Sequence, residues 1–191
     1  MKIIYDEAEF TGRRAVVALG MFDGVHIGHQ ALIRRAVALA EELDAQSVVC
    51  TFDRHPLSVL WPERAPEALL PLHENLKKFE RLGADWALVQ AFTPEYGATD
   101  PTAFLRALVK KLRVAAIVTG ENYTFGAGGR GDADLIRGMA GELGYRAEIS
   151  PPVMDGDVMC SSTRIRQLLA KGETEHAQRL LHIEETEENA I

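Results

Sequence analysis

The sequence predicts an α/β fold: a parallel five-stranded sheet with helices on both faces. Short apolar runs rich in β-branched residues alternate along the chain with stretches of helical periodicity. Each run is apolar at nearly every position, as expected for a strand buried on both sides. Strands that alternate with helices are joined by crossover connections, which place them parallel in one sheet. The five expected strands are Ala15–Leu19, Ser47–Phe52, Trp86–Phe92, Val114–Thr119 and Ala147–Ile149.

Four helices are expected between these strands. The first begins near His29 and repeats apolar residues every three or four positions. The second covers about Glu74–Leu82. Capping residues mark the ends of the other two helices. A side chain with an oxygen often precedes a helix, proline often occupies its first position, and glycine often follows its last residue. These markers are Asp100 and Pro101 for the third helix, and Asp132 and Gly144 for the fourth.

One long segment, residues 53–72, interrupts this alternation with four prolines and no clear periodicity. Loops of that length in compact domains usually serve binding or closure. Near the other end, the stretch CSSTRIRQLLAKGE is followed by a short helical pair and an acidic tail. We therefore expect one domain over residues 1–183 and a solvated, disordered tail over residues 184–191.

Composition narrows the class of protein. The chain has 191 residues and a formal net charge of −7, which argues against nucleic acid as the main partner. Its two cysteines, Cys50 and Cys160, do not have the spacing of metal ligands, and such sparse use fits a reducing cytoplasm. No signal peptide or membrane-spanning stretch is expected, so the predicted location is the cytoplasm, away from membranes.

The stretch GMFDGVHIGH, Gly20 to His29, lies where the first strand ends and the first helix begins. In open α/β sheets, ligands bind at that edge. Glycines let a ligand approach the backbone, and free N–H groups at a helix start attract anions. His26 and His29 can face the same side and donate to phosphate oxygens. The alternatives are a glycine-rich turn with two incidental histidines, or a zinc site, for which no third ligand is evident nearby.

Three further segments fall at the same sheet edge. CSSTRIR, Cys160 to Arg166, offers hydroxyls and arginines at a helix start, or simply a good N-cap. GENYTFGAGGRG, Gly120 to Gly131, suits a loop that approaches a phosphate or a ring, or a flexible connection. TFDRHP, which closes the second strand, is on its own typical of a turn. Neither the GxxxxGK[ST] nor the GxGxxG pattern occurs, so an ordinary NTPase or dinucleotide dehydrogenase is excluded.

Taken together, these motifs resemble those of the prokaryotic FAD synthetases. GMFDGVHIGH is similar to their GxFDGxHxGH signature, whose HxGH element belongs to the wider nucleotidylyltransferase superfamily. TFDRHP looks like that family's TFxPHP, GENYTFG like its G-E-[DN]-F-x-FG, and CSSTRIR like its ISSTxIR. Order and spacing also agree, and the similarity covers roughly residues 1 to 181.

The resemblance implies a Rossmann-like nucleotidyltransferase fold and the reaction FMN + ATP → FAD + pyrophosphate, with Mg²⁺. The FMN phosphate would attack the ATP α-phosphorus in line, without a protein nucleophile. Positioning and electrostatics would then carry most of the rate. No residue is assigned as a direct ligand of the metal, and oligomeric state is not predicted.

The resemblance also implies roles for individual residues. The catalytic group would be His26, His29, Asn122 and Arg166. Residues shaping the ATP site would be Gly20, Phe22, Asp23, Gly28, Ser161, Ser162 and Thr163. Those on the FMN side would be Phe52, His55, Pro56, Tyr123 and Phe125.

The chain departs from the family pattern at two positions and in length. Arg54 stands where the family commonly has proline, and Cys160 where it commonly has isoleucine. Family members usually continue into a riboflavin kinase barrel. Only about ten residues follow Leu181 in this sequence, too few for such a barrel, so no flavokinase activity is expected. Two alternatives stay open: a nucleotidylyltransferase with another acceptor, such as a phosphopantetheine or a polyol phosphate, and a catalytically silent flavin-binding module.

Overall fold

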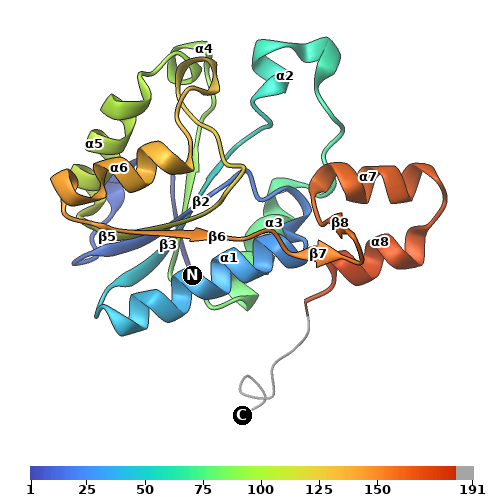
Figure 1. The fold of residues 1–191 in the computed structure, drawn as a ribbon, viewed down its shortest axis with the longest axis horizontal. Coiled ribbons are helices and arrows are strands. Elements are labelled where there is room, and N and C mark those ends of the chain that lie inside the picture. Colours follow the sequence, from blue (N-terminus) through green and yellow to red (C-terminus); the bar gives the residue numbers. More distant parts are fainter. Residues whose placement is uncertain (184–191) are drawn as a thin grey trace.

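A six-stranded parallel sheet forms the centre of the molecule in a computed structural model that describes residues 1–183 (Figure 1). All five neighbouring pairs of strands run parallel, so their carboxyl ends meet at one edge. In spatial order the strands are β1 (Lys2–Ile4), β4 (Trp86–Gln90), β3 (Gln46–Phe52), β2 (Ala15–Leu19), β5 (Val114–Gly120) and β6 (Arg146–Ser150).

The expected number of five strands is wrong by one. The extra strand, β1, has three residues and pairs with β4 from Lys2↔Trp86 to Ile4↔Leu88. Only Ile4 of the three is buried. A segment this short, with a single buried residue, gives no apolar run in the sequence, and its pairing partner lies more than 80 positions along the chain.

Helices cover both faces of the sheet, as the sequence predicts. Neighbouring residues of β2 enter different cores: Val16 and Ala18 pack with the first two predicted helices, Val17 and Leu19 with the last two. This explains why the strands are apolar at successive positions. The four helices are α1 (Ile27–Glu42), α3 (Leu72–Arg81), α5 (Pro101–Leu112) and α6 (Ala133–Leu143).

The predicted caps are confirmed. The carboxylate of Asp100 accepts from two backbone N–H groups of α5 at 3.0 Å, and that of Asp132 accepts from Leu135 at 2.8 Å. Gly144 ends α6 with a φ of 72°, a left-handed conformation that glycine adopts without strain. The first helix starts two residues earlier than expected, because His26 is itself the N-cap of α1.

A smaller lobe follows the sheet at the right of Figure 1. The helices α7 (Ser162–Ala170) and α8 (Thr174–Leu181) pack around a core of their own, next to a hairpin formed by β7 (Met154–Asp155) and β8 (Val158–Met159). The expected acidic tail, residues 184–191, lies outside the described residues. Among residues 1–183, no helix has both the length and the apolar character needed to cross a membrane.

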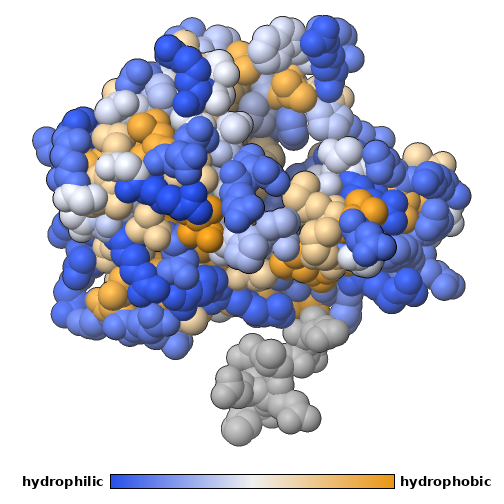
Figure 2. Space-filling model, in the orientation of Figure 1, coloured by the Kyte–Doolittle hydropathy of each residue, from blue (hydrophilic) through white to orange (hydrophobic). Residues whose placement is uncertain are grey.

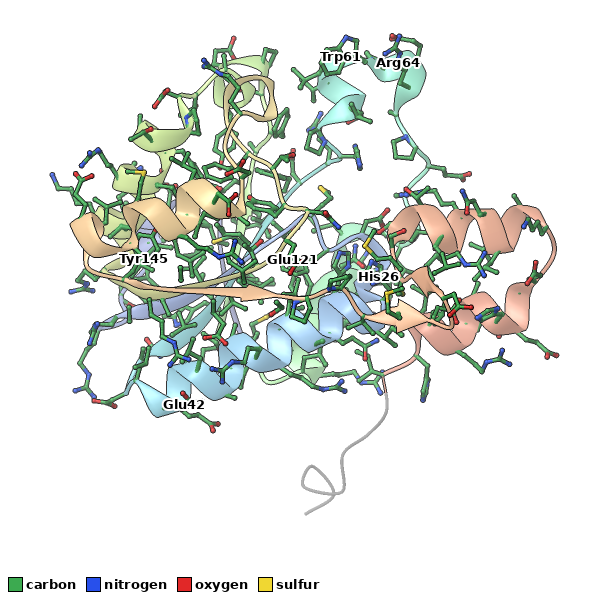
Figure 3. All side chains as sticks on the ribbon, viewed as in Figure 1. His26, Glu42, Trp61, Arg64, Glu121 and Tyr145 are labelled. Atoms are coloured by element: carbon green, nitrogen blue, oxygen red, sulfur yellow. The ribbon has the colours of Figure 1, made fainter. Side chains whose placement is uncertain are left out.

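The proline-rich segment after β3 is largely irregular and carries only two short turns of helix, α2 (Leu57–Leu60) and η3 (Pro62–Arg64). It extends away from the sheet on the carboxyl-edge side, with Trp61 and Arg64 at its tip (Figures 1 and 3). On the other side of the same edge lies another short helix, α4 (Pro94–Gly97).

Candidate functional site

The order of the strands in the sheet determines where the candidate site lies. From β2, the chain crosses through α1 to β3 on one side, whereas β5 leads through α6 to β6 on the other side. Such a reversal leaves a crevice at the carboxyl ends of the two central strands. Leu19 and Gly20 from the end of β2, and Thr119 and Gly120 from the end of β5, line the same pocket. The predicted meeting of the GMFDGVHIGH and GENYTFG segments at one edge is confirmed.

The two histidines form a stacked pair at the start of α1. Their ring centroids are 3.7 Å apart and their planes are 21° from parallel. His26 Nδ1 accepts the backbone N–H of His29 at 3.4 Å, which places His26 as the helix N-cap. Gly28 allows this stacking, because a Cβ there would lie 3.2 Å from the His26 ring. Helix start, glycine and histidines therefore form one local unit.

The turn before α1 is held in an unusual backbone conformation. Phe22 and Val25 have φ values of 52° and 47°, which are rare for residues other than glycine and costly for a β-branched residue. The turn is stabilised from α3, where Asn75 Oδ1 accepts the Gly24 N–H at 3.1 Å. Phe22 is fully buried between Phe79 and the edge of the His29 ring. Phe22 therefore supports the His29 ring from the core and does not line the pocket beside the histidines.

Both histidines are neutral at physiological pH. Burial, and then the positive charge of Lys78, lowers the pKa of His26 to about 4. Burial, and then the repulsion that a protonated His26 would exert, holds the pKa of His29 well below its ordinary value of 6.5. Because Nδ1 of His26 accepts a hydrogen bond, its proton lies on Nε2, which makes that atom a donor. The buried Nδ1 of His29 has no hydrogen-bond partner within residues 1–183.

The N-terminus of α7 is tied to the same turn. Ser161 is its N-cap and accepts the Arg164 N–H at 3.1 Å, as one of the two sequence interpretations requires. The Ser162 hydroxyl donates to the backbone carbonyl of Asp23 at 3.0 Å. Two helix N-termini, those of α1 and α7, are thus brought together, and each favours an anion.

Arg166 is already engaged in this structure. Its guanidinium forms an ion pair with Asp23 and donates to the backbone carbonyl of Glu67 at 2.7 Å. The Asp23 carboxylate also accepts the Leu69 N–H at 3.0 Å. Arg166 and Asp23 therefore link α7, the turn before α1 and the proline-rich segment, and a phosphate at Arg166 would have to share the guanidinium with Asp23.

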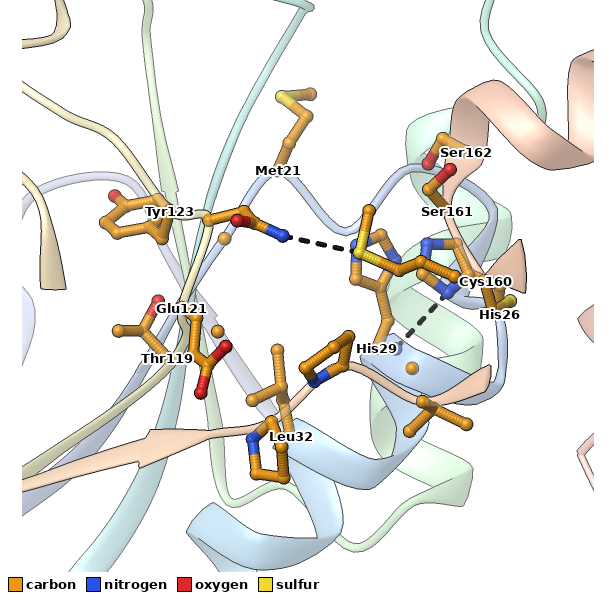
Figure 4. A pocket seen from close by; sticks show the side chains of 18 of the residues that line it. Met21, His26, His29, Leu32, Thr119, Glu121, Tyr123, Cys160, Ser161 and Ser162 are labelled. Carbon is orange, nitrogen blue, oxygen red and sulfur yellow. Dashed lines mark hydrogen bonds between the residues drawn. The ribbon is translucent and has the colours of Figure 1, made fainter. Parts of the chain in front are cut away.

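A first pocket of about 230 Å³ lies beside the histidines (Figure 4). His26 and His29 border one side, and Thr119, Glu121 and Tyr123 the other. Its wall is completed by residues that the sequence analysis did not single out. These are Leu19, Met21, Leu32, Thr119, Glu121, Pro151, Pro152, Val153 and Met159. The signal that could have found some of them is the Pro151–Pro152 pair, which directly follows a strand at the carboxyl edge.

A second pocket of about 420 Å³ adjoins the first and shares Met21, His29 and Ser162 with it. Figure 2 shows this side of the surface hollowed next to the segment that carries α2. Burial, and then the nearby charge of Arg166, lowers the pKa of His55, against the opposing effect of Asp23. Polar and charged side chains predominate in the lining: Asp23, His29, His55, Arg64, Ser162, Thr163 and Arg166.

The residues expected on the flavin side are distributed over several places. Tyr123 lines the first pocket, His55 the second, and Phe52 a third cavity of about 110 Å³ that also includes His55. Phe125 is buried, and neither Phe125 nor Pro56 lines any of these three cavities. Consecutive aromatic contacts nevertheless connect Phe52 with Tyr123, through Phe92, Tyr96, Phe104 and Phe125.

Comparisons with family models and with known proteins point to the same family. The model of the FAD synthetase family matches residues 9–164. The bifunctional riboflavin kinase/FMN adenylyltransferase of Listeria monocytogenes is 37% identical over 175 residues, which are 91% of this chain and 55% of that protein. The FAD synthetase of the same organism is 31% identical over 88% of this chain and 69% of its own length.

Among solved structures, one described as a macrolide-efflux protein from Streptococcus pneumoniae superimposes with a TM-score of 0.80 at 30% identity. That match covers 94% of this chain and 60% of the other. The chain thus spans about half the length of the bifunctional relatives from Listeria monocytogenes and Escherichia coli.

Proposed function

Because the chain belongs to the FAD synthetase family, we propose that it transfers the adenylyl group of ATP to FMN and releases pyrophosphate. The observation that carries the proposal is the junction of two pockets at His29. A reaction between two phosphorylated substrates needs two binding spaces that meet at donors to phosphate. The first pocket has the apolar walls suited to a nucleoside, and the second gathers the charged side chains suited to phosphates.

In the proposed mechanism, an oxygen of the FMN phosphate attacks the ATP α-phosphorus in line. The new P–O bond forms as the bond between the α-phosphorus and the bridging oxygen breaks, and pyrophosphate leaves with the electron pair. The attacking phosphate is already ionised, so no general base is required. The protein's task is to align two anions that repel each other and to stabilise the charge that develops between them.

His26 and His29 suit that task as neutral donors. Their N–H groups, together with the backbone N–H groups at the starts of α1 and α7, would bind phosphate oxygens at the junction of the pockets. Asn122 belongs to the same site, since it lines the first pocket and its amide lies 3.3 Å from the Met159 sulfur. Ordered donors of this kind need little rearrangement when the transition state forms.

We propose that Mg²⁺ arrives with ATP. Among residues 1–183, no group of three or more His, Cys, Asp or Glu side chains could hold a metal ion. Glu121 and Asn122 bring carboxylate and carbonyl oxygens to the first pocket, which fits an ion held mainly by phosphates and water. When bound, the ion would neutralise phosphate charge.

The proposal is tested by incubating the protein with FMN, ATP and Mg²⁺ and following FAD and pyrophosphate by chromatography. FAD and pyrophosphate are expected in equal amounts, and absence of FAD above the blank would overturn the proposal. FMN binding without FAD formation would instead indicate a silent flavin-binding module. A parallel incubation with riboflavin tests the further proposal that these 191 residues have no flavokinase activity, which FMN formation would contradict.

A further inference from the structure

Lys78 occupies a place behind the histidine pair that none of the recognised motifs explains. It lies on α3, is partly buried, and its ammonium group donates to two backbone carbonyls: that of Gly24 at 2.9 Å and that of Leu181 at 2.7 Å. Gly24 belongs to the turn before α1, and Leu181 is the last residue of α8. One side chain therefore joins α3, the turn before α1 and the C-terminal lobe.

Among the described residues, no carboxylate pairs directly with this charge, and Glu74 acts on it only weakly from a distance, after burial and Arg81. Within residues 1–183, Lys78 forms no ion pair, and both of its acceptors are neutral carbonyls. A partly buried charge is costly to maintain, and burial accordingly lowers the pKa of Lys78. The carbonyl of Leu181 lies at the C-terminus of α8, where the helix dipole favours a cation. A positive charge is thus held by dipoles close to the site.

The other titratable groups near His26 carry little net charge, so Lys78 is a main source of positive potential at the His26 ring. On α1, the stacked His29 is neutral. In the turn, the charge of Asp23 is opposed by Arg166 from α7, so this pair has little net charge. The Cys160 thiol, which precedes α7, is kept protonated because burial raises its pKa. Lys78 on α3 acts on His26 through space, and its charge lowers the pKa of that ring.

We propose that Lys78 is a positioning residue for phosphate binding. It holds the carbonyl of Gly24 so that the strained turn keeps the histidine pair in place, and it supplies positive potential behind two neutral donors. The inference rests on the proposed function, because the anion that would experience this potential is the triphosphate of ATP. Lys78 reaches that anion through the turn and through space rather than by direct contact.

Three variants test the proposal. Lys78→Gln retains an N–H donor but removes the charge, and Lys78→Arg retains the charge. Lys77→Gln is the matched control, because Lys77 lies on the exposed side of the same helix and pairs with Glu74 at 2.9 Å. The first readout is the pKa of His26, measured by NMR titration of its ring, with His26→Gln used to assign the signal. This readout does not depend on enzyme activity.

We expect Lys78→Gln to raise the His26 pKa by about 0.5 to 1 unit, because loss of a nearby positive charge makes protonation easier. Lys78→Arg and Lys77→Gln should leave it unchanged. In the FAD-forming assay, Lys78→Gln should raise the KM for ATP about five- to tenfold with kcat within about threefold, as expected for lost ground-state attraction. A merely structural role would lower stability without moving the His26 pKa.

An unchanged His26 pKa and an unchanged KM for ATP in folded Lys78→Gln would overturn the proposal. If Lys78→Gln does not fold, Lys78→Arg still tests the proposal. A raised His26 pKa in folded Lys78→Arg, which keeps the positive charge, would contradict the proposal. If the wild-type chain forms no FAD, the proposed function fails, whereas the NMR titration still tests Lys78.

Discussion

At the scale of residues, the proposed site depends on two histidines that would bind phosphate without carrying charge. Burial makes protonation of both rings costly, and the charge of Lys78 adds to this at His26, so each histidine remains a neutral donor. A neutral N–H gains most when negative charge develops opposite it, which occurs as the transition state forms. Their role is therefore better tested through kcat than through substrate affinity.

We expect His29→Ala to lower kcat about 100-fold or more while FMN binding survives, because the lost donor acts mainly on the transition state. Steady-state kinetics and an FMN binding titration measure the two effects separately. His73→Ala is the control, since His73 is exposed on α3 and pairs only with Glu74 among the described residues. A loss of FMN affinity with kcat retained would contradict the assignment.

The low pKa of His26 also makes stability depend on pH. Its folded pKa of about 4 is below the ordinary 6.5, so between these values the unfolded chain binds more protons. The contribution to stability is complete above pH 6.5 and is lost as pH falls towards 4. Between pH 7.5 and 5.0, we expect His26 to account for a loss of about 2 kcal/mol in the free energy of unfolding.

Urea denaturation of the wild type and of His26→Gln at both pH values checks this expectation. The variant should lose about 2 kcal/mol less than the wild type over that range. His73→Gln should behave like the wild type, because its side chain is 68% exposed. Equal pH dependence in wild type and His26→Gln would show that His26 does not have the lowered pKa.

Part of the pocket lining could be predicted from the sequence, but the pairing of its side chains could not. His26, His29, Ser161 and Ser162 meet at the first pocket as the motifs suggest. The sequence does not indicate that Arg166 is paired with Asp23, since 143 positions separate them. Charge pairing of this kind depends on distances in space, which a local pattern does not contain.

At the scale of elements, the site is a meeting of two helix starts. The turn before α1 and the N-terminus of α7 are joined by the Ser162–Asp23 hydrogen bond, so neither is placed independently. Ser161 caps α7 with a bond of 3.1 Å to the Arg164 N–H. The capping of α7 should therefore affect both stability and ATP binding.

Ser161→Ala is expected to lower the free energy of unfolding by about 1 kcal/mol, the usual cost of a lost N-cap. It should also raise the KM for ATP several-fold, since the start of α7 would be less ordered. Asp132→Ala is the matched control, because Asp132 caps α6 through a similar bond, and α6 lines none of the pockets described above. Denaturation and steady-state kinetics of both variants provide the comparison.

The control Asp132→Ala should lose about as much stability as Ser161→Ala and keep the wild-type KM for ATP. Equal changes in KM for the two variants would show that Ser161 has no role beyond capping.

Elements were predictable where local interactions determine them. The capped starts of α5 and α6 follow from Asp100 and Asp132, whose bonds span two or three residues. The strand β1 was not predictable, because three residues with one buried side chain depend entirely on the neighbouring strand. The short helix α2 was missed for a similar reason, since four residues show no periodicity.

At the scale of the whole molecule, the reversal of strand order places two adjoining pockets at one edge of the sheet. The first has mainly apolar walls and the second gathers more charged side chains, with His29, Met21 and Ser162 shared between them. If each substrate occupies one of these spaces, each should bind on its own and stabilise the fold.

We therefore expect FMN, or an ATP analogue with a non-cleavable α–β linkage, to raise the Tm. A ligand at 100 times its Kd adds about 2.7 kcal/mol, which for a chain of this size corresponds to roughly 5 to 10 °C. Riboflavin at the same concentration should raise Tm less than FMN, because it lacks the phosphate. Differential scanning fluorimetry measures all three, and an equal effect of riboflavin and FMN would argue against phosphate recognition in the second pocket.

The sequence by itself determined the fold class, the four principal helices, the caps of α5 and α6, and the motifs that belong to the FAD synthetase family. These features depend on periodicity and on contacts between residues close in the chain. Only the tertiary structure decided the stacking of the histidines, their neutrality, the engagement of Arg166 and the place of Lys78 behind the site. The physical reason is that burial, charge pairing and pKa depend on groups brought together from distant parts of the chain.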